Sequence, residues 1–112
     1  MSADQPRPAR KHAAHVLAAL GDETRLHLVT RLAAGEPLSI SRLSAGTRMT
    51  RQAVTKHLQV LARAGVTKGR RRGRERLWTL QRTPLREVRQ QLDQIAGHWD
   101  DALARLKASV EG

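Results

Sequence analysis

The sequence predicts a mostly α-helical domain that carries one small β-hairpin. Three observations support this fold class. Apolar residues recur at helical spacing through most of the chain, and the period changes to two only after Gly65. Residues 48–82 hold eleven Lys/Arg against one Glu, a net charge of +10 within a chain total of +11. Residues 83–112 return to one long helical pattern, in which four Lys/Arg face five Asp/Glu.

The length of 112 residues predicts a single domain, which we place at residues 10–112. Residues 1–9 are expected to form a disordered arm, because Pro6 and Pro8 disfavour helix. This arm lacks the apolar core of a secretory signal, and no apolar run approaches the length of a membrane span. The absence of cysteine excludes disulfides and thiolate metal sites within the chain. We therefore expect a cytoplasmic protein without membrane contact.

Two helices are expected in the first third of the chain. The first runs from about Arg10 to Leu20. Asp22 is a strong N-cap candidate for the second, which ends at Gly35. Apolar residues at helical spacing define the inner faces, with Ala13, Val16, Leu17 and Leu20 in the first helix and Leu26, Leu28, Val29, Leu32 and Ala33 in the second.

A pair of helices joined by a short turn is expected next. Ser39 can cap a helix over residues 40–45, after at most a very short strand at residues 38–40. A tight glycine-containing turn then leads to a longer helix, Thr50–Ala64, with Thr50 as its N-cap. Two helices in this arrangement, the second polar on its outer face, are typical of a helix-turn-helix.

The Thr50–Ala64 helix has two unlike faces. Val54, Leu58 and Leu61 form an apolar stripe, and His57 beside them is expected to be a packing histidine. Side chains on the other face suit base edges and phosphates of double-stranded DNA, because Gln can pair bidentately with adenine and Arg with guanine. The expected contacts here are Arg48 in the turn, Thr50 as cap and phosphate donor, and Arg51, Gln52, Thr55, Lys56 and Gln59.

After Gly65, two strands are expected at residues 66–68 and 76–80, joined by a flexible, basic tip at residues 69–74. A basic β-hairpin after a helix-turn-helix completes a winged helix-turn-helix, in the order helix, helix, short strand, helix, helix, strand, strand, helix. The alternative is a solvated charge run without a partner. The expected contacts with phosphates or the minor groove are Lys68, Arg70, Arg71, Arg72 and Arg74.

The last helix is expected to start near Pro84 and to carry a heptad-like apolar stripe over about 26 residues. Such a helix is longer than a small domain needs to close its own core, so we expect a homodimer. Two alternatives stay open: the helix packs only on its own domain, or it binds a different protein. The expected dimer interface comprises Val16, Leu17, Leu20, Leu85, Val88, Leu92, Ile95, Trp99, Leu103 and Leu106.

The segment Leu20–Leu26 (LGDETRL) resembles the "LADPTRL" opening of the ArsR/SmtB family of bacterial and archaeal winged-helix repressors. Residues 51–61 and Ala64–Val66 resemble the family's recognition segment, and residues 71–74 with Trp78 and Leu80 resemble its wing. The resemblance implies a dimer built from the first and last helices, a repressor that binds a palindromic operator, and release by an effector.

Many members of that family sense metals through a Cys-x-Cys motif on the helix before the recognition helix. The matching stretch here, residues 38–43, has no thiol, and the acidic and histidine residues near the C-terminus have the wrong spacing for the family's other known site. We therefore expect no cofactor and no metal. A Zn or Ni site using His12, His15 and His98 of a second chain stays an alternative. No catalytic constellation is present in the sequence, so no enzyme activity is expected.

Overall fold

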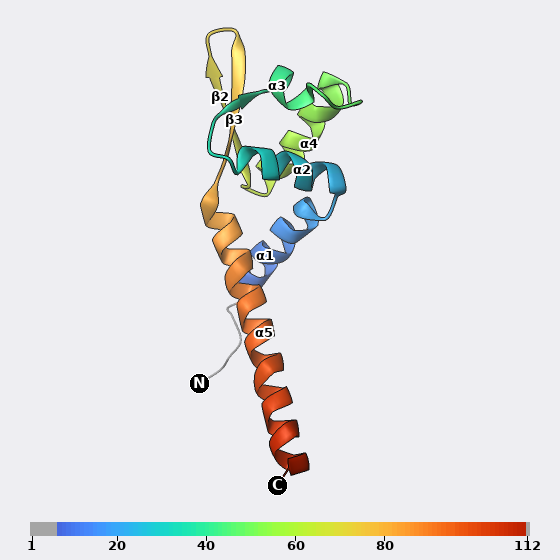
Figure 1. Ribbon diagram of the computed structural model, residues 1–112. Coiled ribbons are helices and arrows are strands. Elements are labelled where there is room, and N and C mark those ends of the chain that lie inside the picture. Colours follow the sequence, from blue (N-terminus) through green and yellow to red (C-terminus); the bar gives the residue numbers. More distant parts are fainter. Residues whose placement is uncertain (1–6, 112) are drawn as a thin grey trace.

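The computed structural model describes residues 7–111 (Figure 1). It confirms the expected order of elements and the mostly helical fold with a small hairpin. The elements are α1 (Arg7–Leu20), α2 (Glu23–Leu32), β1 (Leu38–Ser39), α3 (Ile40–Ser44), α4 (Arg51–Arg63), β2 (Thr67–Arg72), β3 (Glu75–Leu80) and α5 (Arg82–Glu111).

Helix α1 begins three residues earlier than the sequence predicted. The expected disordered arm covered residues 1–9, but residues 7–9 are helical, and residues 1–6 lie outside the described part of the chain. Pro8 is compatible with this start because it lies in the first turn, where backbone N–H groups have no acceptor within the helix. Helix α1 therefore begins at Arg7 and not at Arg10.

Helix α2 buries only part of the inner face that was expected. Its cap is as predicted, since the Asp22 carboxylate accepts from the backbone N–H of Arg25 at 3.0 Å. Leu28, Val29 and Leu32 are buried, whereas Leu26 is 53 % exposed. At 100° per residue Leu26 lies 200° around the helix from Leu28, so the two cannot share an inner face. Ala33, also expected inside, follows the helix as its C-cap and is exposed.

Two clusters of buried side chains make up the core, and α4 contributes to both. One cluster joins α1, α2, α4 and the start of α5, and the other joins α2, α3, α4 and β3. Leu61 of α4 lies in the first cluster, and Val54 and Leu58 lie in the second. All three side chains are fully buried. Helix α4 is therefore fixed from two directions.

The three strands form one antiparallel sheet in the order β1-β3-β2, so β2 is an edge strand. The hairpin of β2 and β3, hereafter the wing, differs from the expectation of a flexible tip at residues 69–74. Strand β2 continues to Arg72, which pairs with Glu75, and only two residues form the turn. Gly73 has φ +61°, the positive value that a two-residue hairpin turn of this kind requires.

Helix α5 has 30 residues, about 45 Å at the usual rise, and most of it extends beyond the rest of the domain (Figure 1). Its first turns cross α1. This crossing corrects part of the expected dimer interface, because Val16 and Val88 belong to the core of their own chain. Leu20 and Leu85 are partly buried against the same cluster. The remaining six residues are exposed: Leu17, Leu92, Ile95, Trp99, Leu103 and Leu106.

The core assignment predicts a contrast between two leucines. Leu58→Ala should lower the free energy of unfolding by about 2–5 kcal/mol, because it leaves a cavity where a fully buried side chain was. Leu26→Ala removes the same atoms from an exposed site and should change the free energy of unfolding by no more than about 0.5 kcal/mol. Urea unfolding followed by circular dichroism, at one protein concentration, measures both. Equal losses in the two variants would contradict the assignment.

Candidate nucleic-acid interface

The outer face of α4 presents its polar side chains to solvent. Thr50 caps the helix, with its hydroxyl oxygen accepting from the backbone N–H of Ala53 at 3.1 Å. Because Val54, Leu58 and Leu61 are turned into the core, the opposite side must face outward. The residues exposed there are Arg51, Gln52, Lys56 and Gln59, and Thr55 is half-buried beside them.

Five of the predicted contact residues line one shallow hollow between α3 and α4. The hollow is bounded by Ile40 on α3 and by Arg51, Gln52, Thr55, Lys56 and Gln59 on α4. Two of these side chains are held by neighbours. Arg51 Nη2 donates to Ser41 Oγ at 2.7 Å, and Thr55 Oγ1 donates to the carbonyl of Arg51 at 2.8 Å. A guanidinium has five N–H donors, so Arg51 retains others for a ligand.

Arg48 is exposed in the turn before α4, as expected of a contact residue. The turn itself is stabilised by Thr47, whose hydroxyl donates to the carbonyl of Ser44 at 2.7 Å. Gly46 has φ +78°, a value that other residues rarely adopt. The turn therefore has a defined backbone conformation, which fixes the position of Arg48 relative to α4.

The wing distributes its cations over two faces. In the strand register Lys68, Arg70 and Arg72 lie opposite Thr79, Leu77 and Glu75, on one face. Arg71 lies opposite Arg76 on the other face, together with Gly69 and Trp78. Arg74 is in the turn. All five predicted wing cations are exposed, but they do not form the single cluster that the run of arginines suggested.

Arg63 and Arg76 lie near this surface but were not among the contact residues predicted from the sequence. A hollow between α4 and the wing is lined by Gln59, Ala62, Arg63, Gly69, Arg76 and Trp78. Arg63 follows Gln59 by four residues, and Arg76 precedes Trp78 by two. The helical and strand periods therefore already placed both on the relevant faces.

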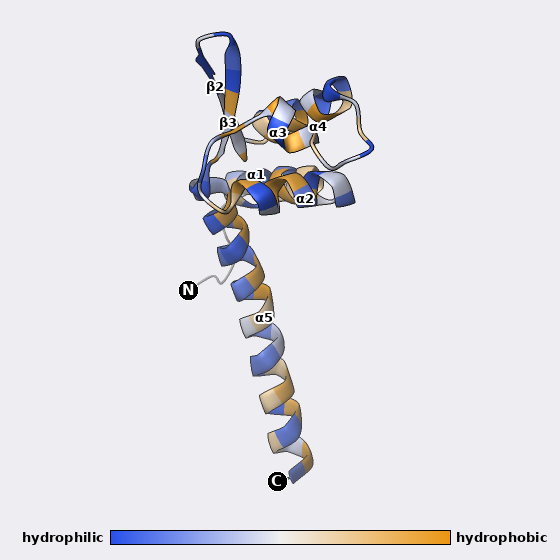
Figure 2. Cartoon of the chain, turned by 45° about the horizontal axis from the view of Figure 1, so that its top comes forward, coloured by the Kyte–Doolittle hydropathy of each residue, from blue (hydrophilic) through white to orange (hydrophobic). Residues whose placement is uncertain are grey.

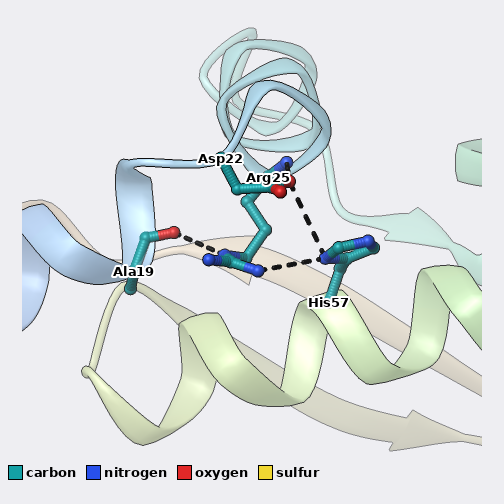
Figure 3. Close-up of polar contacts among 4 residues, drawn as sticks. All are labelled: Ala19, Asp22, Arg25 and His57. Carbon is teal, nitrogen blue, oxygen red and sulfur yellow. Dashed lines mark hydrogen bonds and ion pairs between the residues drawn. The ribbon is translucent and has the colours of Figure 1, made fainter.

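A polar network joins α1, α2 and α4 (Figure 3). Arg25 Nε donates to the carbonyl of Ala19 at 2.6 Å, and its Nη1 donates to His57 Nδ1 at 3.3 Å. Asp22 lies 4.0 Å from the same histidine nitrogen. Because a guanidinium can only donate, this contact places the proton of neutral His57 on Nε2.

The Asp22 carboxylate is stabilised in its charged form. The hydrogen bond from the backbone N–H of Arg25 lowers the pKa of Asp22 most strongly. The positive charge of Arg25, and that of His57 in its protonated form, lower it further, and partial desolvation opposes them. At neutral pH the cap is therefore ionised, as suits a residue at a helix N-terminus.

The histidines considered as metal ligands do not form a cluster within residues 7–111, where no three His, Cys, Asp or Glu side chains come together in a suitable group. His12 Nδ1 contacts Glu87 Oε2 on α5 at 2.5 Å. A metal at His12 would have to use the other ring nitrogen or displace this carboxylate.

None of the helices within residues 7–111 combines the length and the hydropathy that crossing a membrane requires.

The fold and this basic face define a winged helix-turn-helix DNA-binding domain. Residues 20–70 match the family described as "Helix-turn-helix domain". The chain is 39 % identical over 85 residues to the HTH-type transcriptional regulator Rv2034 of Mycobacterium tuberculosis, covering 76 % of each protein. It belongs to the ArsR family of HTH-type transcriptional regulators.

Solved structures agree with this family. The ArsR-like transcriptional regulator from Rhodococcus sp. RHA1 superimposes with a TM-score of 0.75 at 33 % identity, over 88 % of this chain and 92 % of that one. A possible ArsR-family regulator from Mycobacterium bovis, Mb0332, described as a homodimeric winged helix-turn-helix DNA-binding domain, superimposes with a TM-score of 0.64 at 24 % identity, over 88 % and 91 %. The second likeness shows the fold alone.

The network predicts energetic coupling between Arg25 and His57. Arg25→Met and His57→Leu should each lower the free energy of unfolding by about 1–2 kcal/mol, and the double variant should lose at least about 0.5 kcal/mol less than the sum. Urea unfolding of the wild-type chain, the two single variants and the double variant at one pH measures these losses.

Arg31→Met is the matched control, because Arg31 is on the same helix but donates to the carbonyls of Arg42 and Leu43. Combined with His57→Leu it should show additive losses. Additive losses for Arg25 and His57 as well would contradict the coupling.

Proposed function

We propose that the chain is a homodimeric repressor that binds a palindromic operator through α4 and the wing of each protomer. The observation that carries this proposal is the exposure of polar and basic side chains on the outer face of α4, beside a basic wing, while the opposite face of α4 is fully buried. A basic surface of this kind suits a polyanion, and the helix-turn-helix geometry suits a major groove.

In this proposal α4 contacts base edges in the major groove. Gln52 can form two hydrogen bonds with adenine, and Arg51 and Lys56 can donate to guanine. Thr50 donates to a phosphate, while Arg48, Thr55 and Gln59 contact the edges of the site. The wing adds phosphate or minor-groove contacts through Lys68, Arg70, Arg71, Arg72 and Arg74.

A second copy of the chain is the proposed occupant of the exposed apolar stripe on α5. Figure 2 shows hydrophobic bands repeated along α5, including the part that leaves the domain. Trp99 is 65 % exposed, although large apolar side chains at helical spacing are normally covered. Residues 83–112 carry a net charge of only −1, four Lys/Arg against five Asp/Glu, so two copies would repel little. The related fold from Mycobacterium bovis is described as homodimeric.

A two-fold dimer would present two α4 helices to the same side of the DNA. Half-sites of an inverted repeat about one helical turn apart, or a multiple of it, would match that symmetry. A dimer bound over a promoter would exclude other proteins from it, which is the physical basis of the proposed repression.

The α4 assignment predicts the effect of a double substitution. Arg51→Ala/Lys56→Ala should weaken binding to an operator, selected by the wild-type protein from random duplexes, by about 30- to 20,000-fold, because the two lost contacts contribute about 1–3 kcal/mol each. Fluorescence anisotropy at fixed salt measures it. Arg10→Ala/Lys11→Ala on α1 removes the same charge and should bind within about threefold of wild type. A folded Arg51/Lys56 variant with unchanged affinity would refute the assignment.

The dimer assignment predicts a change of mass in solution. The wild-type chain should sediment as a dimer at micromolar concentration, and Ile95→Asp/Trp99→Asp should sediment as a folded monomer, because two desolvated charges would lie in the interface. Arg89→Asp, on an exposed site outside the stripe, should remain dimeric. A monomeric wild-type chain would favour the alternative that α5 binds a different protein.

A further inference from the structure

The hollow between α4 and the wing contains two arginines that the proposed DNA contacts do not use. Arg63 lies on α4 and Arg76 on β3, and both are exposed. The other lining residues are Gln59, Ala62, Gly69 and Trp78. No carboxylate lines this hollow, so nothing within it neutralises the two guanidinium groups.

Arg76 is held in place by an aromatic ring. Its guanidinium carbon lies 5.3 Å from the centre of the Trp78 ring, within the range of a cation–π interaction. Trp78 is only 3 % exposed and belongs to the core cluster of α2, α3 and α4. The buried ring of Trp78 therefore gives the guanidinium of Arg76 a fixed surface to pack against.

Gly69 leaves the space that Arg76 occupies. Gly69 pairs with Trp78 in the sheet, and a Cβ added there would lie 2.5 Å from Arg76 Nε and 3.3 Å from the Trp78 ring. The backbone of Gly69 is extended, so its conformation alone does not demand glycine. What glycine provides at this position is room for the guanidinium.

The position of the hollow indicates what it faces when DNA is bound. The major and minor grooves of DNA are separated by one sugar-phosphate backbone. A protein that places a helix in the major groove and a hairpin in the adjacent minor groove must straddle that backbone. Since the hollow lies between α4 and the wing, it would face the phosphates of that strand.

We propose that Arg63 and Arg76 form a phosphate clamp between the recognition helix and the wing, with Arg76 positioned by Trp78 and Gly69. The ligand is a backbone phosphate of the bound DNA. The clamp rests on the proposed DNA-binding function and fixes the wing in one register relative to α4.

Gly69→Ala tests position separately from charge. It keeps every cation but displaces the guanidinium of Arg76, so affinity for the selected operator should fall about tenfold. The slope of log affinity against log salt concentration should become shallower by roughly the amount of one phosphate contact. Arg76→Gln should have the same effect, and the double variant should lose no more than either alone. Arg105→Gln on α5 removes the same charge and should bind within about twofold of wild type.

A neutralised phosphate gives a second, chemical readout. One phosphate at a time is replaced by an uncharged methylphosphonate along each strand of the operator. Wild-type binding should weaken when the replaced phosphate is the one between the α4 and wing contacts. Binding by Arg76→Gln should be insensitive to that one substitution while remaining sensitive elsewhere.

Folding is checked by circular dichroism, and Trp78 emission is followed in a Trp99→Phe background. Because Arg76 is exposed, Arg76→Gln decides the matter even if Gly69→Ala unfolds. A folded Arg76→Gln variant with unchanged affinity, salt dependence and methylphosphonate profile would overturn the phosphate clamp but not the proposed DNA-binding function. The proposed function fails separately if the wild-type chain does not bind duplex DNA with an affinity that Arg51 and Lys56 determine.

Discussion

The rest of the structure depends on the burial of one face of α4. Val54, Leu58 and Leu61 are fully buried and connect two core clusters, so the helix can neither rotate nor slide without opening both. The outward direction of its polar side chains follows from this constraint, because a helix that buries one stripe must expose the opposite one. The contact between Arg25 and His57 adds a polar tie between the same helix and α2.

Much of this arrangement was predictable from the sequence, because periodicity and capping are local properties. The helix order, the Asp22, Ser39 and Thr50 caps and the inner face of α4 all follow from short-range patterns. The error in the expected dimer interface came from long-range packing. Val88 fits a heptad stripe equally well inside its own chain or between chains, and only the crossing of α1 and α5 decides between them.

The same distinction applies to the candidate site. A run of arginines indicates charge, but the strand register decides which face each side chain occupies. Gly69 was expected in a flexible tip, whereas it is a paired strand residue that makes room for Arg76. The presence of a basic surface was therefore predictable from the sequence, whereas the face on which each of its side chains lies was not. The DNA contacts of individual residues on that surface remain predictions.

We propose that the outer face of α4 and the wing form the DNA-binding surface and that α5 lies outside it. An amide-resolved NMR titration of the whole chain with its selected operator tests this most directly. We expect the largest chemical-shift changes at residues 51–59 and in β2 and β3, with little change beyond residue 95. The largest changes in the C-terminal half of α5, with α4 unaffected, would contradict it.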